Sequence, residues 1–258
     1  MSARIQLARA LILVAAAACS TPTATVVPRF GSLDIDGEFG ISGTVNAQSN
    51  DISSIGLEDD HSVFSGRADL GWGSPHFTLA YSASDHSGTG MLEAELSQGG
   101  VTIPANTAVD SRFKLGLSEA LLTFDLIPLE NIELGLGFGA VGLDMDVNIV
   151  AVSTGDRIFT DEFAVAPVLA VRAAGQLGPI ELSGLLAGLD VEVDGSQAQI
   201  LDLDLAARWQ FTRKSRLLGA LTAGWRRFSL GLDYEDAGDQ VTAEFALTGP
   251  YFGLAFGF

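Results

Sequence analysis

The final stretch of the chain, residues 240–258, constrains the fold more than any other segment. Large apolar side chains recur at every second position near its end: Phe252, Leu254, Phe256 and Phe258. A period of two places these side chains on one face of a β-strand. Water solvates such a face poorly, whereas lipid solvates it well. In a bilayer every backbone polar group must be paired within the protein, so an all-β chain crosses it only as a closed barrel.

Segments with the same alternation recur along the chain and predict an all-β fold, a closed antiparallel up-and-down transmembrane barrel of about ten strands. The expected strands are residues 33–45, 62–73, 76–96, 108–127, 131–151, 161–177, 180–194, 197–211, 217–234 and 240–258. Short connections follow the second, fourth, sixth and eighth strands, and longer ones follow the first, third and fifth. This pattern is typical of a barrel with both termini on the short-turn side. Weak hydrophobicity in the sixth and seventh strands leaves eight or twelve strands as alternatives.

The N-terminal segment has the pattern of a secretion signal. Arg4 and Arg9 precede a short apolar core that ends in small residues. This core is too short for a transmembrane helix. The expected organisation is a signal peptide at residues 1–18, with cleavage as late as residue 24, a periplasmic lead-in at 19–31 and the barrel at 32–258.

Cys19 is the only cysteine, so no disulfide can form within the chain. It directly follows three alanines and resembles the lipid-attachment cysteine of bacterial lipoproteins, although Ala16 stands where that motif usually carries leucine. Cys19 is therefore a candidate lipidation site. Ordinary cleavage nearby, with no role for the thiol, is the alternative that we favour.

The chain is strongly acidic, with 14 Lys and Arg against 32 Asp and Glu and a formal net charge of −18. Nucleic-acid binding needs a basic surface that neutralises phosphates. We therefore expect no nucleic-acid partner. An acidic surface repels anions and favours solubility, but it does not by itself specify a function.

Six charged residues interrupt the expected strands on the face opposite the large apolar side chains: Arg67, Asp69, Glu119, Arg172, Arg208 and Arg226. An arginine on the lipid face at mid-depth costs about 2–4 kcal/mol. We therefore expect these charges inside the barrel lumen. There they can form a lattice of ion pairs and hydrogen bonds, an interpretation that we favour over a transport pathway. A barrel near eight strands is filled by its own side chains, and ten strands leave room for a narrow file of water at most.

The aromatic end of the chain resembles the C-terminal signature of bacterial outer-membrane β-barrels. Over residues 30–258 the pattern is similar to the small barrels of the OmpA, OmpX and OmpW groups, with echoes at 56–60, at 99–107 and in Gly249-Pro250. The resemblance implies a place in the outer membrane, with membrane lipid and the barrel-assembly machinery as partners. It also implies that Phe252, Leu254, Phe256 and Phe258 act as the assembly signal. Activity and oligomeric state do not follow from it.

No catalytic constellation or cofactor motif is recognisable. None of the three histidines, His61, His76 and His86, has a Ser or Asp at a spacing that suggests a triad, and no pair has metal-ligand spacing on one strand face. Residues 137–142 match a dinucleotide fingerprint in letters, but an alternating strand follows where a helix is needed. We therefore expect a protein that is not an enzyme and has no cofactor.

Acidic residues in the seventh and eighth strands suggest a weaker hypothesis, a divalent-cation site formed by Asp190, Glu192, Asp202 and Asp204. A two-residue turn at 195–196 would place Asp190 near Asp202. Crowded carboxylate oxygens suit Ca²⁺ or Mg²⁺. The alternative that we favour is a solvated acidic rim in which salt screens the repulsion.

The strict alternation slips at five places: Ser118-Glu119, Ala140-Val141, Gly184-Leu185, Arg226-Arg227 and 248–250. Each slip exchanges the two faces of a strand. It indicates a bulge, a misread register or the point where the strand leaves the membrane.

These patterns together predict an integral outer-membrane β-barrel with a structural or surface-interaction role. A narrow, cation-preferring pore is the first alternative. A soluble periplasmic β protein or lipoprotein is the second.

Overall fold

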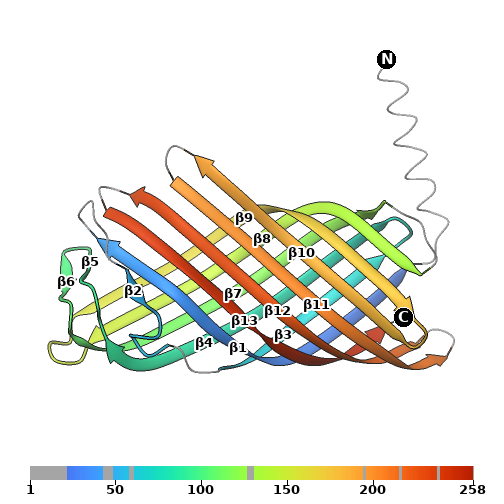
Figure 1. Ribbon diagram of the computed structural model, residues 1–258, viewed down its shortest axis with the longest axis horizontal. Helices are drawn as coiled ribbons and strands as arrows, with labels where there is room; N and C mark the ends of the chain where they lie inside the picture. The colour runs from blue at the N-terminus through green and yellow to red at the C-terminus, as the bar shows by residue number, and fades with distance from the viewer. Residues whose placement is uncertain are drawn as a thin grey trace, which may run out of the picture.

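The described part of the chain forms a closed antiparallel β-barrel (Figure 1). The computed structural model describes residues 22–42, 49–57, 61–126, 131–193, 196–214, 217–236 and 239–257. Ten strands form the barrel: β1 (Thr23–Ser42), β3 (His61–Gly71), β4 (Pro75–Met91), β7 (Ala108–Asp125), β8 (Ile132–Ala151), β9 (Arg157–Leu177), β10 (Ile180–Val193), β11 (Ser196–Lys214), β12 (Leu217–Asp236) and β13 (Asp239–Gly257). Each strand pairs with the next, and β13 pairs back with β1. The predicted all-β barrel of ten strands is confirmed.

The barrel has two different ends. We call the end where β1 begins and β13 ends the base, and the opposite end the crown. Short connections join the strands at the base, as predicted from their lengths. At the crown, the two-residue strand β2 (Asn50–Asp51) pairs with β1, and β5 (Leu96–Gln98) pairs with β6 (Val101–Ile103) as a separate hairpin. Among the described residues, no helix is long and apolar enough to span a membrane.

The first strand is longer than predicted. It begins at Thr23, so most of the segment expected as a periplasmic lead-in at 19–31 is part of the barrel wall. Val26 and Phe30 face outward, while Val27 faces inward. The threonines and Pro28 in this stretch are not typical of a membrane strand. Proline in particular is disfavoured in a sheet, because it has no N–H to donate to a neighbouring strand. The pairing of β1 with β13 accordingly passes over Val27 and Pro28.

The apolar face of the strands changes side partway along the barrel. In β8, Leu136 and Phe138 are exposed on the outside, whereas Val141, Leu143 and Ile149 farther along are buried inside. The register of β8 with both neighbours is continuous through this change, so no bulge causes it. The slip at Ala140-Val141 therefore marks a level in the barrel. On the base side of it the large apolar side chains face outward, and on the crown side they face inward.

The same change occurs on other strands, including β7, β10 and β12. Inward residues of the crown form one buried apolar cluster, to which Leu117, Leu143, Leu185, Ile200, Phe228, Leu230 and Leu247 belong. An apolar exterior with a polar interior suits lipid, and a polar exterior with an apolar interior suits water. The base half is thus built for a membrane and the crown half for an aqueous phase.

Two connections close the crown. Residues 52–57 fill the wall between β1 and β4 beyond the short strand β3, with Ile52 N donating to Gly37 O (2.9 Å) and Met91 N to Ser54 O (2.7 Å). Their apolar side chains and those of residues 92–103 are buried in the crown cluster. The β5–β6 hairpin contacts both β1 and β9, and Gln98 Nε2 donates to Thr160 Oγ1 at 2.8 Å. The hairpin therefore lies across the opening.

Candidate functional site

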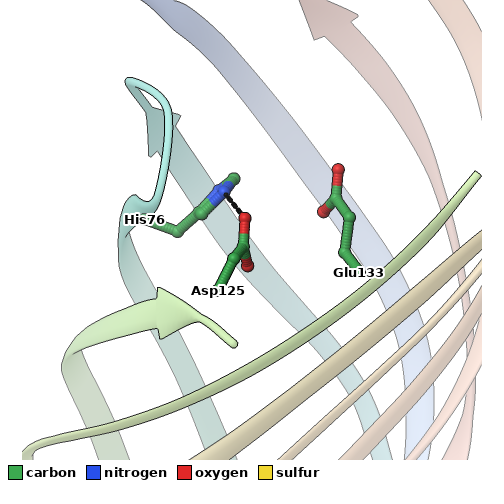
Figure 2. A group of neighbouring side chains, drawn as sticks. All are labelled: His76, Asp125 and Glu133. Carbon is green, nitrogen blue, oxygen red and sulfur yellow. Dashed lines mark hydrogen bonds and ion pairs between the residues drawn. The ribbon is translucent and has the colours of Figure 1, made fainter. Parts of the chain in front are cut away.

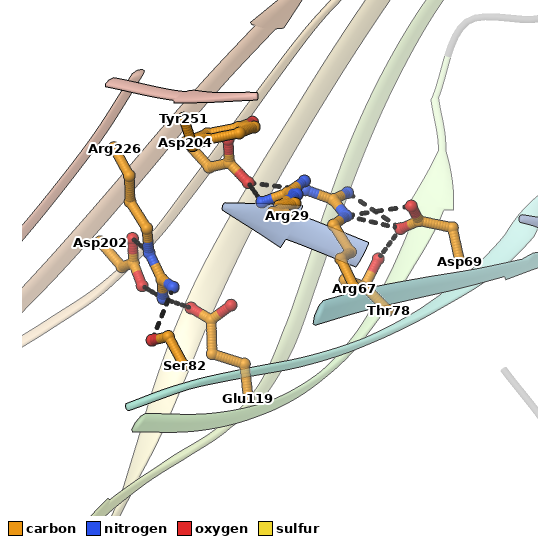
Figure 3. A network of polar contacts seen from close by, with 10 residues as sticks. All are labelled: Arg29, Arg67, Asp69, Thr78, Ser82, Glu119, Asp202, Asp204, Arg226 and Tyr251. Carbon is orange, nitrogen blue, oxygen red and sulfur yellow. Dashed lines mark hydrogen bonds and ion pairs between the residues drawn. The ribbon is translucent and has the colours of Figure 1, made fainter. Parts of the chain in front are cut away.

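A lattice of charges crosses the lumen in the base half (Figure 3). Asp204 of β11 accepts hydrogen bonds on Oδ2 from Arg29 Nη1 (2.7 Å) and Arg67 Nη1 (3.2 Å). The hydroxyl of Tyr251 donates to the other oxygen of Asp204, and the guanidinium of Arg29 lies 4.4 Å from the centroid of the Tyr251 ring. Arg67 Nε donates to Asp69 at 2.9 Å. Because β3 and β11 lie far apart in the strand order, these contacts bridge across the barrel.

Arg226 of β12 forms the second part of the lattice. It donates to both oxygens of Asp202, from Nε to Oδ1 at 3.0 Å and from Nη2 to Oδ2. Its Nη1 reaches across to Ser82 Oγ at 3.1 Å, and Nη2 lies 3.6 Å from Glu119. Arg226, Asp202 and Glu119 are only 8%, 3% and 7% exposed. These charges therefore face one another and not bulk water.

Cross-strand register explains why these side chains meet. Asp204 and Arg226 are direct partners on β11 and β12, which makes Asp202 the diagonal neighbour of Arg226. Glu181 and Arg208 are likewise partners on β10 and β11, and their side chains form an ion pair at 2.9 Å. Directly opposite and diagonal side chains on one face lie within reach of each other. The lattice follows from the spacing of charges on neighbouring strands.

The lumen opens at the base into a cavity of about 370 Å³. His76, Glu133 and Arg172 are among its lining residues. Figure 2 shows His76 with its Nε2 turned toward Asp125, and Oδ2 of Asp125 lies 3.0 Å away. Arg172 donates from Nη2 to Asp125 Oδ1 (2.5 Å) and from Nη1 to Glu133 Oε2 (2.6 Å). Arg67 and Asp69 of the lattice line the same cavity, so this cluster lies at the edge of the lattice that faces the base.

The outer surface of the crown is acidic. Exposed acids on outward-facing positions and loops include Asp34, Asp36, Glu38, Asp85, Asp110, Asp144, Asp161, Asp190, Glu192 and Glu244. Within the described part of the crown the basic residues are Arg112, Lys114, Arg157 and Arg227. Arg112 Nε donates to Asp85 at 2.9 Å, and this hydrogen bond raises the pKa of Arg112. Lys114 lies 3.7 Å from Asp146.

The six charges predicted to lie in the lumen all occupy inward-facing positions of their strands: Arg67, Asp69, Glu119, Arg172, Arg208 and Arg226. Each of the six has an oppositely charged side chain within 4 Å. The sequence pattern did not identify the acids that complete these pairs. Asp202 and Asp204 had been assigned to a cation site instead.

The four acids of the predicted divalent-cation site are not brought together. Val193 pairs with Ser196, so Asp190 lies opposite Gln199, and not near Asp202 as predicted. Asp-Gly at 194–195 is a stronger two-residue hairpin signal than the Gly-Ser pair that follows it, which explains the shifted register. Asp190 and Glu192 are exposed on the outside of the barrel. Asp202 and Asp204 are buried inside among arginines.

The predicted assembly signal is described in part. Phe252, Leu254 and Phe256 face outward and are 67%, 44% and 50% exposed, as the alternation predicts. Phe258, Cys19 and the expected signal peptide at residues 1–18 lie outside the described residues.

His86 is separate from the cluster around His76. It is buried inside the crown beside Phe113, with 6.5 Å between the ring centroids.

Several lumen residues were missed by the sequence reasoning. Arg29 lies in the segment 19–31 that is predicted as a lead-in. Tyr251 lies next to Phe252 on the last strand, and the alternation alone gives it no role. Asp125 and Glu133 lie beside the turn between β7 and β8, where polar residues are expected on any fold. Only their position in the sequence indicates a common site, because both lie next to a short connection at the same barrel end as His76.

Solved structures of outer-membrane barrels resemble this fold. The outer membrane protease OmpT from Escherichia coli matches with a TM-score of 0.57 and 10% identity, over 93% of this chain and 98% of that chain. The TodX deltaS2S3 mutant monoaromatic hydrocarbon channel gives a TM-score of 0.40 and 6% identity, over 92% and 90% of the two chains. The β domain of the Bordetella autotransporter BrkA gives 0.38 and 12%, over 92% and 99%.

No protein-family model matches the chain, and no curated protein matches its sequence. The predicted resemblance to outer-membrane β-barrels is confirmed at the level of the fold. At such low identity the likeness to OmpT shows a shared architecture and carries no activity with it.

Proposed function

We propose that this protein is an integral outer-membrane barrel with a sealed lumen, and that its acidic crown serves a structural or surface-interaction role. The change of apolar face between base and crown carries the proposal. β8 has 20 residues, whereas about 9–11 residues are enough to cross a bilayer. The remaining length forms a projection with its own dry core, which is a scaffold for an exposed surface.

Two barriers support a lumen that does not conduct. Buried apolar side chains form a continuous cluster inside the crown, and the β5–β6 hairpin lies across it. The lattice around Arg226 and Asp204 crosses the lumen nearer the base. An ion would have to separate buried pairs and then cross an apolar plug, both at high cost. These barriers favour the sealed barrel over a narrow cation-preferring pore.

The charge of the crown suggests the chemistry of a partner. Its acids outnumber its basic residues, so it repels anionic surfaces and attracts cationic ones, with a range set by the ionic strength. We infer that the crown interacts with cationic peptides, cationic protein surfaces or mobile cations. The proposal assigns no catalytic step to the protein.

Single-channel recording tests the seal. The purified protein, folded and reconstituted in a planar bilayer, should give conductance near the baseline of the empty membrane. Steady ohmic steps from the wild-type protein would refute the sealed lumen and favour the pore. A variant lacking residues 93–106 removes the hairpin and leaves the lattice in place, so its conductance measures how well the rest of the lumen is sealed without the hairpin.

Labelling of single cysteines tests the placement of the crown. In a Cys19→Ser background, Asp190→Cys at the exposed end of β10 should react with a membrane-impermeant maleimide on intact cells. Pro179→Cys, in the exposed connection between β9 and β10 at the base, should react only after the outer membrane is permeabilised. Equal labelling of both positions in intact cells, or of neither, would contradict the proposed orientation.

A further inference from the structure

A cluster at the base of the barrel has the donors of a metal site. His76 stands near the start of β4, Asp125 at the end of β7 and Glu133 near the start of β8, so three strand ends converge (Figure 2). One possible ligand atom from each residue lies within 4.8 Å of the others. We propose that His76, Asp125 and Glu133 bind one divalent transition-metal ion of the Zn²⁺ type.

The donor set favours this class of ion. Imidazole nitrogen suits Zn²⁺ and its neighbours in the first transition series, whereas Ca²⁺ and Mg²⁺ prefer oxygen ligands alone. One imidazole and two carboxylates supply three protein ligands, and sites with three protein ligands keep their remaining position for water. His76 and Glu133 line the cavity of about 370 Å³ that is open at the base. That cavity provides both the water ligand and a path of entry.

Arg172 prepares the two carboxylates for the ion. Its Nη2 binds Asp125 Oδ1 and its Nη1 binds Glu133 Oε2. The second oxygen of each carboxylate is not used by Arg172, and Oδ2 of Asp125 already faces His76 Nε2. Hydrogen bonds of this kind to the second oxygen of a ligand orient it and are costly to lose. Two carboxylates against one guanidinium leave an excess of negative charge at the cluster, and this excess attracts a cation.

The surroundings also separate this site from the lattice. Asp69 and Glu181 line the same cavity but are already bound to Arg67 and Arg208. In contrast, the only partner of His76 Nε2 among the described contacts is Asp125. A metal ion would replace a single weak His–Asp contact and tie three strand ends together at the base. The site lies at the opposite end from the crown, so it is independent of the proposed surface interaction.

Spectroscopy with Co²⁺ tests the proposal on the unaltered protein. Metal-free protein, folded in detergent, should bind one Co²⁺ per chain and develop visible absorption of a low-coordinate nitrogen–oxygen site. Added Zn²⁺ should abolish that absorption stoichiometrically, and a large excess of Mg²⁺ should not. No Co²⁺ absorption and no saturable Zn²⁺ binding by calorimetry would overturn the proposal and leave the cluster as a plain ion-pair network.

Variants locate the site. His76→Gln should weaken Zn²⁺ binding by more than the roughly 10–100-fold expected for losing an outer hydrogen-bond partner, and Glu133→Gln should weaken it at least tenfold. The matched control is Asp190→Asn with Glu192→Gln at the crown, which should bind Zn²⁺ as the wild type does. Heat-modifiable mobility on a gel verifies that each variant is folded. Unchanged affinity in folded His76→Gln, or loss in the crown control, would refute the assignment.

Discussion

Arg226→Met tests whether the charges in the lumen are held by their mutual contacts. Methionine keeps much of the apolar length of the side chain but removes the hydrogen bonds to Asp202 and Ser82. Asp202 and Glu119, which are 3% and 7% exposed, would then face each other without a cation between them. Removing one partner of a buried ion pair costs about 3–5 kcal/mol. This is a loss of about two to four powers of ten in the folding equilibrium.

The next residue provides a matched control. Arg227 has the same side chain one position along β12, but it is exposed on the outside of the barrel. Arg227→Met should change the free energy of unfolding by less than about 0.5 kcal/mol, as most surface substitutions do. In the Arg226→Met background, Asp202→Asn should recover part of the loss, because it removes one of the two stranded charges.

Equilibrium unfolding in urea measures these differences. The protein is folded into short-chain lipid vesicles, and tryptophan fluorescence follows unfolding while gel mobility reports the folded fraction. The expected order of midpoints is wild type and Arg227→Met together, then the double variant, then Arg226→Met. If Arg226→Met and Arg227→Met unfold at the same urea concentration, the lattice does not stabilise the barrel and the reasoning fails.

Three further predictions use the two zones of the barrel. Phe228→Ala leaves a cavity in the crown core and should lower the free energy of unfolding by about 3–5 kcal/mol. Phe252→Ala on the outside should lower it much less, because lipid fills the gap, and urea midpoints compare the two variants. Gly137→Leu should abolish folding on a heat-modifiable gel, because a Cβ there would lie 1.9 Å from the carbonyl oxygen of Leu122. Deletion of Phe258 should lower the amount of folded protein in outer-membrane fractions while barely changing the stability of the folded fraction.

The sequence was a good guide to the strands because the period of two is a local signal. Each predicted strand after the first corresponds to an observed one within a few residues at most ends. The third strand is the clearest exception, since it ends at Met91 and Leu96 begins a separate hairpin. The alternation continues through that connection because its apolar side chains are buried in the crown. Periodicity alone does not distinguish a strand from a buried loop with the same spacing.

The site was harder to predict because it depends on register. A shift of two residues in the β10–β11 hairpin separates Asp190 from Asp202, because every pair along two strands moves with the choice of the turn. The cluster of His76, Asp125 and Glu133 is similarly non-local. His76 is far from Asp125 and Glu133 in sequence, and the three meet only because β7 pairs with β4 on one side and with β8 on the other.

The lattice lies directly beside the crown core, and this position explains why its charged side chains depend on ion pairs with one another. Asp202 is the strand partner of Phe228, and Glu119 is the partner of Val141, so the last layer of charge lies directly against the first layer of apolar side chains. The apolar cluster lies on the crown side of these groups, and the cavity of about 370 Å³ opens on the base side. On the sealed-lumen proposal, a solute or ion that acts on the interior enters from the base, and the crown acts through its outer surface.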